Sequence, residues 1–223
     1  MSLNVLFAAS QSGWTKYGDA LCRAFAAAGL DVDLRQEFPA PMVDYVVYAP
    51  SDAAPLDFSG FTRLKVVLAL WAGVEQIVQN PTLKVPLTKM VETGLSAGMV
   101  EWVCGHVLRY HLGLDRHTAM NNRDWRPADA PLARDRRVGV LGLGELGKAS
   151  ARALSQLNFV VSGWARGPKI IDGVDCYHGP GGLNNILQNS EILVLLLPLT
   201  TETRNLLNAE RLGRLPRGAR ILN

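Results

Sequence analysis

Residues 137–147 read RVGVLGLGELG and are the most informative segment of the sequence for the fold. An apolar strand pattern, Val138 to Leu141, runs directly into glycines spaced G-x-G-x-x-G, and a helical pattern from Leu146 to Leu157 follows. This spacing indicates a dinucleotide site when a strand precedes it and a helix follows it, and both conditions are met here. The stretch therefore predicts a Rossmann-type dinucleotide-binding unit.

Each glycine of the turn has a distinct expected role. Gly142 permits the tight turn, Gly144 leaves room for a pyrophosphate, and Gly147 lets the helix pack close to the strand. The backbone of Glu145 and Leu146 lies in the first helical turn, where free N–H groups attract an anion. The alternative is a glycine-rich turn that binds no ligand.

The residues after the second strand of this unit bear on the choice of cofactor. A site for NAD normally has an acid about 20 residues after the turn, where it bonds the ribose hydroxyls. This sequence has Arg166 and Lys169 there and no acid. Arginine offers a forked, permanently charged donor to a 2′-phosphate, so NADPH is the preferred cofactor and NADH the second possibility. The alternative is that both side chains are simply solvated.

The rest of the chain predicts two α/β domains. Residues 1–96 alternate strand and helix patterns and form a smaller, flavodoxin-like βα domain. Residues 94–98, GLSAG, are interpreted as a flexible break before a linking helix within 97–122. Residues 123–223 form the dinucleotide-binding domain, a doubly wound parallel sheet with about four strands, fewer than the usual six, and we expect it to be incomplete.

Composition excludes several classes of protein. The chain has 48% hydrophobic and 19% charged residues, as in a compact globular protein, and its net charge is only +3. The basic residues are scattered along the chain, so nucleic acid is an unexpected partner. The three cysteines are widely spaced and form no metal-ligand pattern, so we expect neither disulfides nor a metal site. Their pattern predicts a cytoplasmic location. No apolar run is long enough to span a membrane and no targeting segment is visible.

Several separated motifs, in this order, resemble those of the D-isomer-specific 2-hydroxyacid dehydrogenases, especially the glyoxylate/hydroxypyruvate reductases. They are WAGVE at 71–75, MVEW at 99–102, the glycine turn, WAR at 164–166 and LLPLT at 196–200. The resemblance implies an enzyme that reduces a small 2-keto acid to the D-2-hydroxy acid with hydride from NAD(P)H. It also implies a homodimer.

The resemblance assigns further site residues. The backbone of Ala72, Gly73 and Val74 corresponds to the loop that holds the substrate carboxylate, and Tyr48 to a bulky position lining the pocket. Met99 and Glu101 correspond to helix residues near the cofactor, and Leu197, Pro198 and Thr203 to the turn that contacts it. For Tyr48 and Met99 the alternative is ordinary core packing.

The catalytic residues of the family have no counterpart in this sequence. An arginine that binds substrate, a histidine that donates the proton and an acid that tunes the histidine are expected after Asn223, in a longer protein. His106, His111, His117 and His178 lack the family's context, so no catalytic residue is assigned. The alternative function is a nucleotide-binding sensor without catalytic activity.

Overall fold

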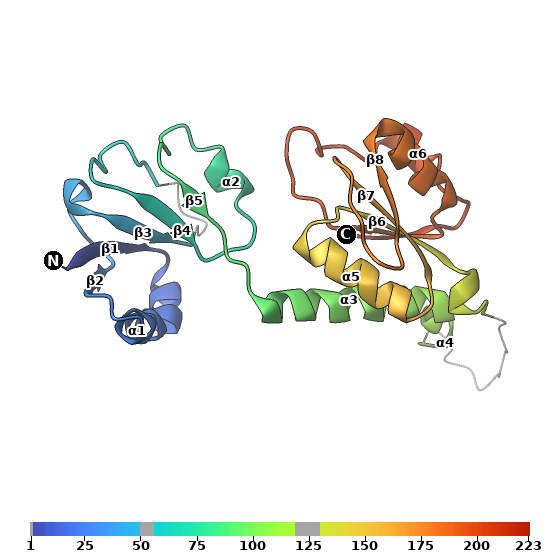
Figure 1. Cartoon of the computed structure of the whole chain (residues 1–223), viewed down its shortest axis with the longest axis horizontal. Helices are drawn as coiled ribbons and strands as arrows, with labels where there is room; N and C mark the ends of the chain where they lie inside the picture. The colour runs from blue at the N-terminus through green and yellow to red at the C-terminus, as the bar shows by residue number, and fades with distance from the viewer. Residues whose placement is uncertain (1, 50–55, 119–129) are drawn as a thin grey trace. The chain divides into compact units, whose positions relative to one another are not determined.

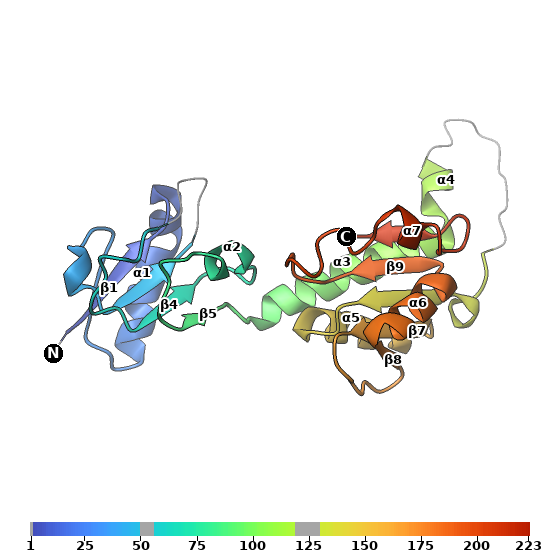
Figure 2. The same cartoon turned by 90° about the horizontal axis from the view of Figure 1, so that it is seen from above.

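The computed structural model describes residues 2–49, 56–118 and 130–223. The chain separates into two compact units, Met1–Val91 and Glu92–Asn223, which are described one at a time. Figures 1 and 2 show each unit as a twisted sheet with helices packed on it.

The first unit is a five-stranded parallel sheet in the order β2-β1-β3-β4-β5. This is the flavodoxin-like order, which confirms the fold expected for this part of the chain. Its strands are β1 (Leu3–Ala8), β2 (Val32–Arg35), β3 (Tyr45–Tyr48), β4 (Val66–Ala69) and β5 (Leu87–Thr88). Its helices are α1 (Gln11–Ala27), the short 3₁₀ helix η1 (Ala40–Met42) and α2 (Glu75–Val78).

Alternating residues of β1 support both faces of this first sheet. Val5 and Phe7 form one buried cluster, against which Trp14 and Leu21 of α1 pack, whereas Leu6 belongs to the cluster on the other side. Two-residue periodicity places successive side chains on opposite faces of a strand. The first unit therefore has a core on each side of its sheet.

The second unit is also a five-stranded parallel sheet, in the order β10-β9-β6-β7-β8. Counted from β6, its first strand, this is the 3-2-1-4-5 order of a doubly wound dinucleotide-binding sheet, as predicted. Its strands are β6 (Arg137–Leu141), β7 (Val160–Ala165), β8 (Asp175–His178), β9 (Ile192–Leu195) and β10 (Arg220–Leu222). Its helices are α3 (Thr93–Leu112), α4 (Leu114–Thr118), η2 (Ala133–Asp135), α5 (Glu145–Gln156), α6 (Gly179–Asn189) and α7 (Ala209–Leu212).

Strand β6 shows why this sheet is covered on both faces. Val138 and Val140 are buried with residues of α3 and α5, such as Val107 and Leu154. Leu141 is buried in a different cluster with the apolar side of α6. Figure 1 shows the same arrangement, with α3 and α5 on one side of the sheet and α6 on the other.

Two expectations about local structure are wrong. Residues 94–98 are not a break, because α3 begins at Thr93 and includes them. The carboxylate of Glu92 starts this helix by accepting hydrogen bonds from the Gly94 and Leu95 N–H groups, at 2.7 and 2.8 Å. These bonds hold the pKa of Glu92 below its usual value. The second sheet also has five described strands rather than about four, since β8 was not recognised.

Candidate dinucleotide-binding site

The turn from β6 to α5 is built around Gly142. Its backbone has φ +101°, a conformation that favours glycine, and its N–H donates to the Trp164 carbonyl at 2.8 Å. A Cβ at this position would lie 2.5 Å from the Leu196 carbonyl oxygen. Only glycine fits the turn without moving the neighbouring chain.

Gly147 and Gly144 have opposite surroundings. A Cβ on Gly147 would overlap the carbonyl oxygen of Gly142, so a side chain there would push α5 away from β6. A Cβ on Gly144 would have no atom of the described residues within 4 Å. Gly144 is exposed and opens the start of α5 to solvent. The three glycines thus have the geometry expected of them from the sequence.

No side chain of the described residues caps the first turn of α5. Lys148 N–H makes the first bond of the helical ladder, to the Gly144 carbonyl at 2.8 Å, so the N–H groups of Glu145, Leu146 and Gly147 precede that ladder. Side chains cap α1, α3 and α7, whereas Gly144 provides none for α5. Helix α6 also lacks such a cap, but it has Pro180, which carries no N–H, in its first turn.

The position of this turn in the sheet is also informative. β6 lies between β7 and β9, and the strand order reverses there. In open α/β sheets ligands bind outside the carboxyl ends of the strands at this reversal. The glycine turn, the residues after β7 and the residues after β9 all lie at that edge. A pyrophosphate therefore fits the free N–H groups of α5, next to the open side of Gly144.

Thr203 organises the loop after β9. Its hydroxyl donates to the Pro198 carbonyl at 2.5 Å and accepts from the Thr200 N–H at 2.7 Å. Leu197 packs against the apolar cluster that contains Leu141. These contacts hold Leu197, Pro198 and Thr203, which the resemblance assigns to the cofactor side, in one loop beside the glycine turn.

Arg166 follows β7 directly and reaches toward the loop after β9. Its guanidinium lies 3.2 Å from the carboxylate of Glu202, and both side chains are exposed. Because β6 separates β7 from β9, this ion pair links the two flanks of the glycine turn. Lys169 is also exposed, and no ion pair to it is found among the described residues. The sequence did not identify Glu202, because its partner is 36 residues away.

Helix α3 carries the two remaining positions of the cofactor side. Met99 is half-buried and packs against the core cluster of the second unit, whereas Glu101 is exposed. The packing of Met99 agrees with the alternative of a core residue.

In the first unit, Tyr48 and the loop 72–74 lie at one edge of the sheet. Tyr48 ends β3, is buried edge-on against Phe58, and its hydroxyl accepts from the Leu56 N–H at 3.3 Å. The neighbouring strand β4 ends at Ala69, three residues before the loop, in which Gly73 is exposed. Tyr48 is thus largely used in packing.

The described histidines have different surroundings. His111 is buried edge-on against Phe159, and burial, together with the charge of Arg136, lowers its pKa. The His106 ring lies against Trp102 at a tilt of 53°, with ring centres 4.5 Å apart, and His178, which precedes α6, is exposed. The side chain of His117 lies outside the described residues. In the described part of the chain, no three His, Cys, Asp or Glu side chains cluster as metal ligands.

No helix among the described residues combines the length and apolar character that crossing a membrane requires.

The fold and the glycine turn define a dinucleotide-binding α/β protein, and comparison with known proteins specifies its family. Residues 106–223 match the model of the D-isomer specific 2-hydroxyacid dehydrogenase, NAD binding domain. The chain belongs to the D-isomer specific 2-hydroxyacid dehydrogenase family, as the sequence motifs indicated.

Two curated relatives are both named glyoxylate/hydroxypyruvate reductase A. The protein of Serratia proteamaculans is 33% identical over 202 residues, which are 82% of this chain and 64% of the relative. That of Yersinia enterocolitica is 37% identical over 170 residues, which are 72% of this chain and 54% of the relative. The chain thus spans between 54% and 64% of the length of these two relatives.

Two solved structures share the fold over nearly the whole chain. A D-isomer specific 2-hydroxyacid dehydrogenase from Xanthobacter autotrophicus, in complex with NADPH and MES, is 37% identical, with a TM-score of 0.87 over 99% of this chain and 71% of that one. The NADPH-dependent glyoxylate/hydroxypyruvate reductase of Sinorhizobium meliloti, in complex with NADP and sulfate, is 33% identical, with a TM-score of 0.81 over 100% of this chain and 72% of that one.

Proposed function

We propose that this chain provides the cofactor-binding unit and the substrate-carboxylate-binding unit of an NADPH-dependent reductase of small 2-keto acids. The observation that carries the proposal is the uncapped start of α5 beside the open position of Gly144. The cofactor supplies the hydride, and reduction of a keto acid of the glyoxylate or hydroxypyruvate type gives the D-2-hydroxy acid. The curated relatives, which are named reductases, favour this function over a nucleotide sensor.

On the cofactor side, the N–H groups of Glu145, Leu146 and Gly147 bind the pyrophosphate. Arg166 binds the 2′-phosphate, and Lys169 adds a second positive charge beside it. NADPH is preferred over NADH because no acid stands where it would bond the ribose hydroxyls. The complexes of the Xanthobacter and Sinorhizobium proteins with NADPH and NADP support this preference. On the nicotinamide side we place Leu197, Pro198, Thr203 and Met99.

On the substrate side, the backbone N–H groups of the loop Ala72–Gly73–Val74 hold the keto acid's carboxylate, and Tyr48 borders the pocket. Main-chain donors are well suited to this role, because they bind an anion at short range without a charged side chain. Gly73 is exposed, so a ligand can approach its backbone closely. The proposed domains are 1–96 for substrate, 97–122 as the linking helix and 123–223 for cofactor. A cytoplasmic homodimer completes the proposal.

Cofactor choice is tested by titrating the chain with NADPH and NADH, following cofactor fluorescence. Arg166→Ala should weaken NADPH binding about 10- to 100-fold, because a hydrogen bond to a charged group is worth roughly 1.5–3 kcal/mol. NADH binding should stay within about twofold, since it has no 2′-phosphate. Arg152→Ala, an exposed arginine of α5, is the matched control and should leave both affinities unchanged. Equal losses for both cofactors would refute the role of Arg166.

The reaction is tested separately, by NADPH oxidation with glyoxylate, hydroxypyruvate and bulkier 2-keto acids. We expect turnover with the two small acids, and little with the bulkier ones, from a protein in which this chain is joined to the family's catalytic arginine and histidine, to which no residue of this sequence corresponds. Tight NADPH binding by that protein without turnover on any keto acid would refute the reductase and leave the cofactor proposal standing.

A further inference from the structure

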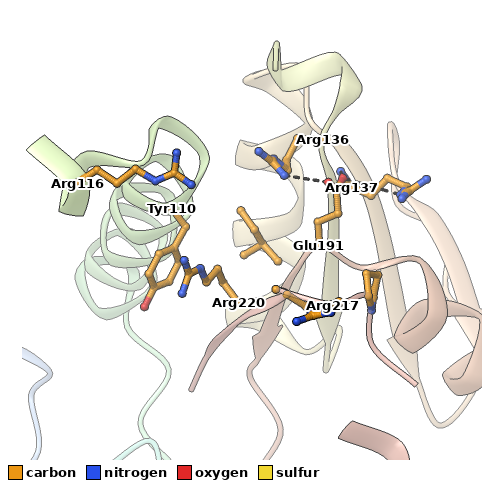
Figure 3. A pocket seen from close by; sticks show the side chains of 11 residues that line it. Tyr110, Arg116, Arg136, Arg137, Glu191, Arg217 and Arg220 are labelled. Carbon is orange, nitrogen blue, oxygen red and sulfur yellow. Dashed lines mark hydrogen bonds and ion pairs between the residues drawn. The ribbon is translucent and has the colours of Figure 1, made fainter. Parts of the chain in front are cut away.

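Arginines gather at the amino edge of the second sheet, opposite the glycine turn. A cavity of about 260 Å³ is lined there by the first residues of β6, β9 and β10, which are Arg137, Ile192 and Arg220. Tyr110 near the end of α3 and Arg116 of α4 complete one wall. Five arginines that lie at three places along the sequence are thus brought together by the fold (Figure 3).

The charges in this cavity are unbalanced. Among the described residues, its lining includes five arginines and a single carboxylate, that of Glu191. Glu191 is already used: it accepts from Arg136 at 2.8 Å and from the Arg137 backbone N–H at 3.0 Å. Among the described residues no carboxylate is paired with Arg116 or Arg217, which are both exposed. An anion from outside would compensate charges that Glu191 does not reach.

Donors are also left without partners. The Nε of Arg136 is buried and has no hydrogen-bond partner in the described part of the chain. In Figure 3, Arg116 and Arg136 point toward one another across the cavity, although both carry positive charge. Like charges that face one another repel, and an anion between the two groups would turn this repulsion into attraction. The pKa of the adjacent His111, which burial and the charge of Arg136 lower, is consistent with a positive field.

The chemistry of the lining selects phosphate. A planar guanidinium group can donate two parallel hydrogen bonds to two oxygens of one phosphate. The volume of the cavity suits a small ligand better than a polymer. The cavity is also distinct from the cofactor turn: β6 runs from Arg137 at the cavity to Leu141 at the turn, and the four steps between them, at about 3.3 Å each, span roughly 13 Å. We infer that this cavity is a second, separate anion site that binds a small phosphate-bearing molecule.

Inorganic pyrophosphate is the probe for this site, in calorimetric titrations of the chain in a phosphate-free buffer. The unchanged chain should bind it saturably. Removing the two unpaired charges together, in Arg116→Gln/Arg217→Gln, should weaken binding at least tenfold without lowering the melting temperature. Arg134→Gln is the matched control, because this exposed arginine lies in η2 near the cavity but does not line it. It should bind pyrophosphate like the unchanged chain.

A further variant separates this site from the cofactor turn. Gly144→Asp places a carboxylate at the start of α5 and should leave pyrophosphate binding at the arginines unchanged. Loss of binding in Gly144→Asp but not in the double arginine variant would overturn the inference, because the probe would then occupy the glycine turn. Equal weakening by Arg134→Gln would also overturn it, by showing attraction to general positive charge. Neither result depends on whether the chain reduces a keto acid.

Discussion

In each of the two sheets the first strand leads through a turn into a helix, and the two turns differ in how that helix begins. In the first unit Ser10 precedes α1, and its hydroxyl accepts the Gly13 N–H at 3.2 Å. In the second unit Gly144 precedes α5 and has no side chain to do so. Gly13 and Gly147 are each the third residue of their helix. The same position therefore carries a satisfied N–H in one turn and an N–H without a side-chain cap in the other.

The two glycines at this shared position also differ in how much room they leave for a side chain. A Cβ on Gly13 would lie 3.3 Å from the Cβ of Ala9, a tight contact that a small shift relieves. A Cβ on Gly147 would overlap the Gly142 carbonyl oxygen, which is backbone in the turn itself. A fold that includes a strand, a turn and a helix does not by itself create an anion site. The site needs the missing cap and the close approach of helix to strand.

The largest effect is expected from Gly147→Ala. Relieving the overlap with Gly142 requires α5 to move away from β6, which opens a well-packed core and distorts the turn. We expect a loss of several kcal/mol in the free energy of unfolding, as for other overpacked positions, and loss of NADPH binding. Urea unfolding and cofactor fluorescence measure the two effects.

Gly13→Ala is the control for this change, at the same helical position of the first unit. Its free energy of unfolding should change by no more than about 1 kcal/mol, because the gain in helix propensity offsets the tight contact. Similar losses in the two variants would contradict the distinction between the turns.

Gly144→Asp converts the second turn toward the first. The new carboxylate occupies open space and accepts the free N–H groups of α5, as Ser10 does for α1. The variant should gain about 0.3–1 kcal/mol of stability, because the carboxylate complements the helix N-terminus, whereas capping itself adds only a few tenths relative to glycine. NADPH should bind at least about 100-fold more weakly, since the site is filled and negatively charged. Higher melting temperature with unchanged NADPH affinity would show that the cofactor does not use this helix.

The sequence predicted the second turn well because its signals are local. A strand, three glycines and a helix follow one another within 137–157, so the pattern itself carries the geometry. β8 was missed because Asp175–His178 is short and half polar. Its extended conformation depends on pairing with β7, which the local sequence does not reveal. The start of α3 was missed because the capping role of Glu92 follows from a hydrogen bond that only the structure shows, from the Gly94 N–H to the Glu92 carboxylate.

Ion pairs and the arginine cavity lay beyond prediction for a different reason. Arg166 and Glu202, or Arg116 and Arg217, are far apart in the chain, and only the order of the strands and the packing of helices on the sheet bring them together. Propensity and periodicity contain no information on such pairs. For Tyr48, by contrast, the sequence did suggest its packing: core packing was the alternative to a pocket role, and the side chain is buried edge-on against Phe58.

A smaller difference between the units is expected in acid. Burial, then the charge of Arg136, lowers the pKa of His111 in the second unit. In the first unit, burial raises the pKa of Asp44, but hydrogen bonds from the Asn4 N–H and Arg63 outweigh it and hold that pKa below its usual value. When pH falls through 6.5, the ordinary value for histidine, the unfolded state gains a proton that folded His111 resists, so the second unit loses stability. The contribution of Asp44 to the stability of the first unit is lost only when the pH falls below 3.8, toward the lower pKa that Asp44 has in the folded state.

Hydrogen exchange read separately for the peptides of each unit checks this order. Between pH 7 and 5 protection should decrease in the second unit and stay nearly constant in the first, after correction for intrinsic exchange rates. His111→Phe keeps an aromatic ring against Phe159 and removes the titration, so it should flatten the decrease. An equal decrease in that variant would assign the effect to other groups.

The smallest effect concerns Glu202, which pairs with Arg166 across the flanks of the glycine turn. If Arg166 binds the 2′-phosphate, the carboxylate of Glu202 competes with that phosphate for the same guanidinium and also repels it. Exposed ion pairs contribute only about 0.2–1 kcal/mol, so Glu202→Gln should tighten NADPH binding by roughly two- to fivefold and leave NADH unchanged. Glu210→Gln is the control, because Glu210 is an exposed acid paired with Arg214 at 2.6 Å, within and just after α7. An equal gain in both variants would indicate a general charge effect, whereas a gain confined to Glu202 and NADPH would show that this acid sets how strongly the second turn discriminates between the two cofactors.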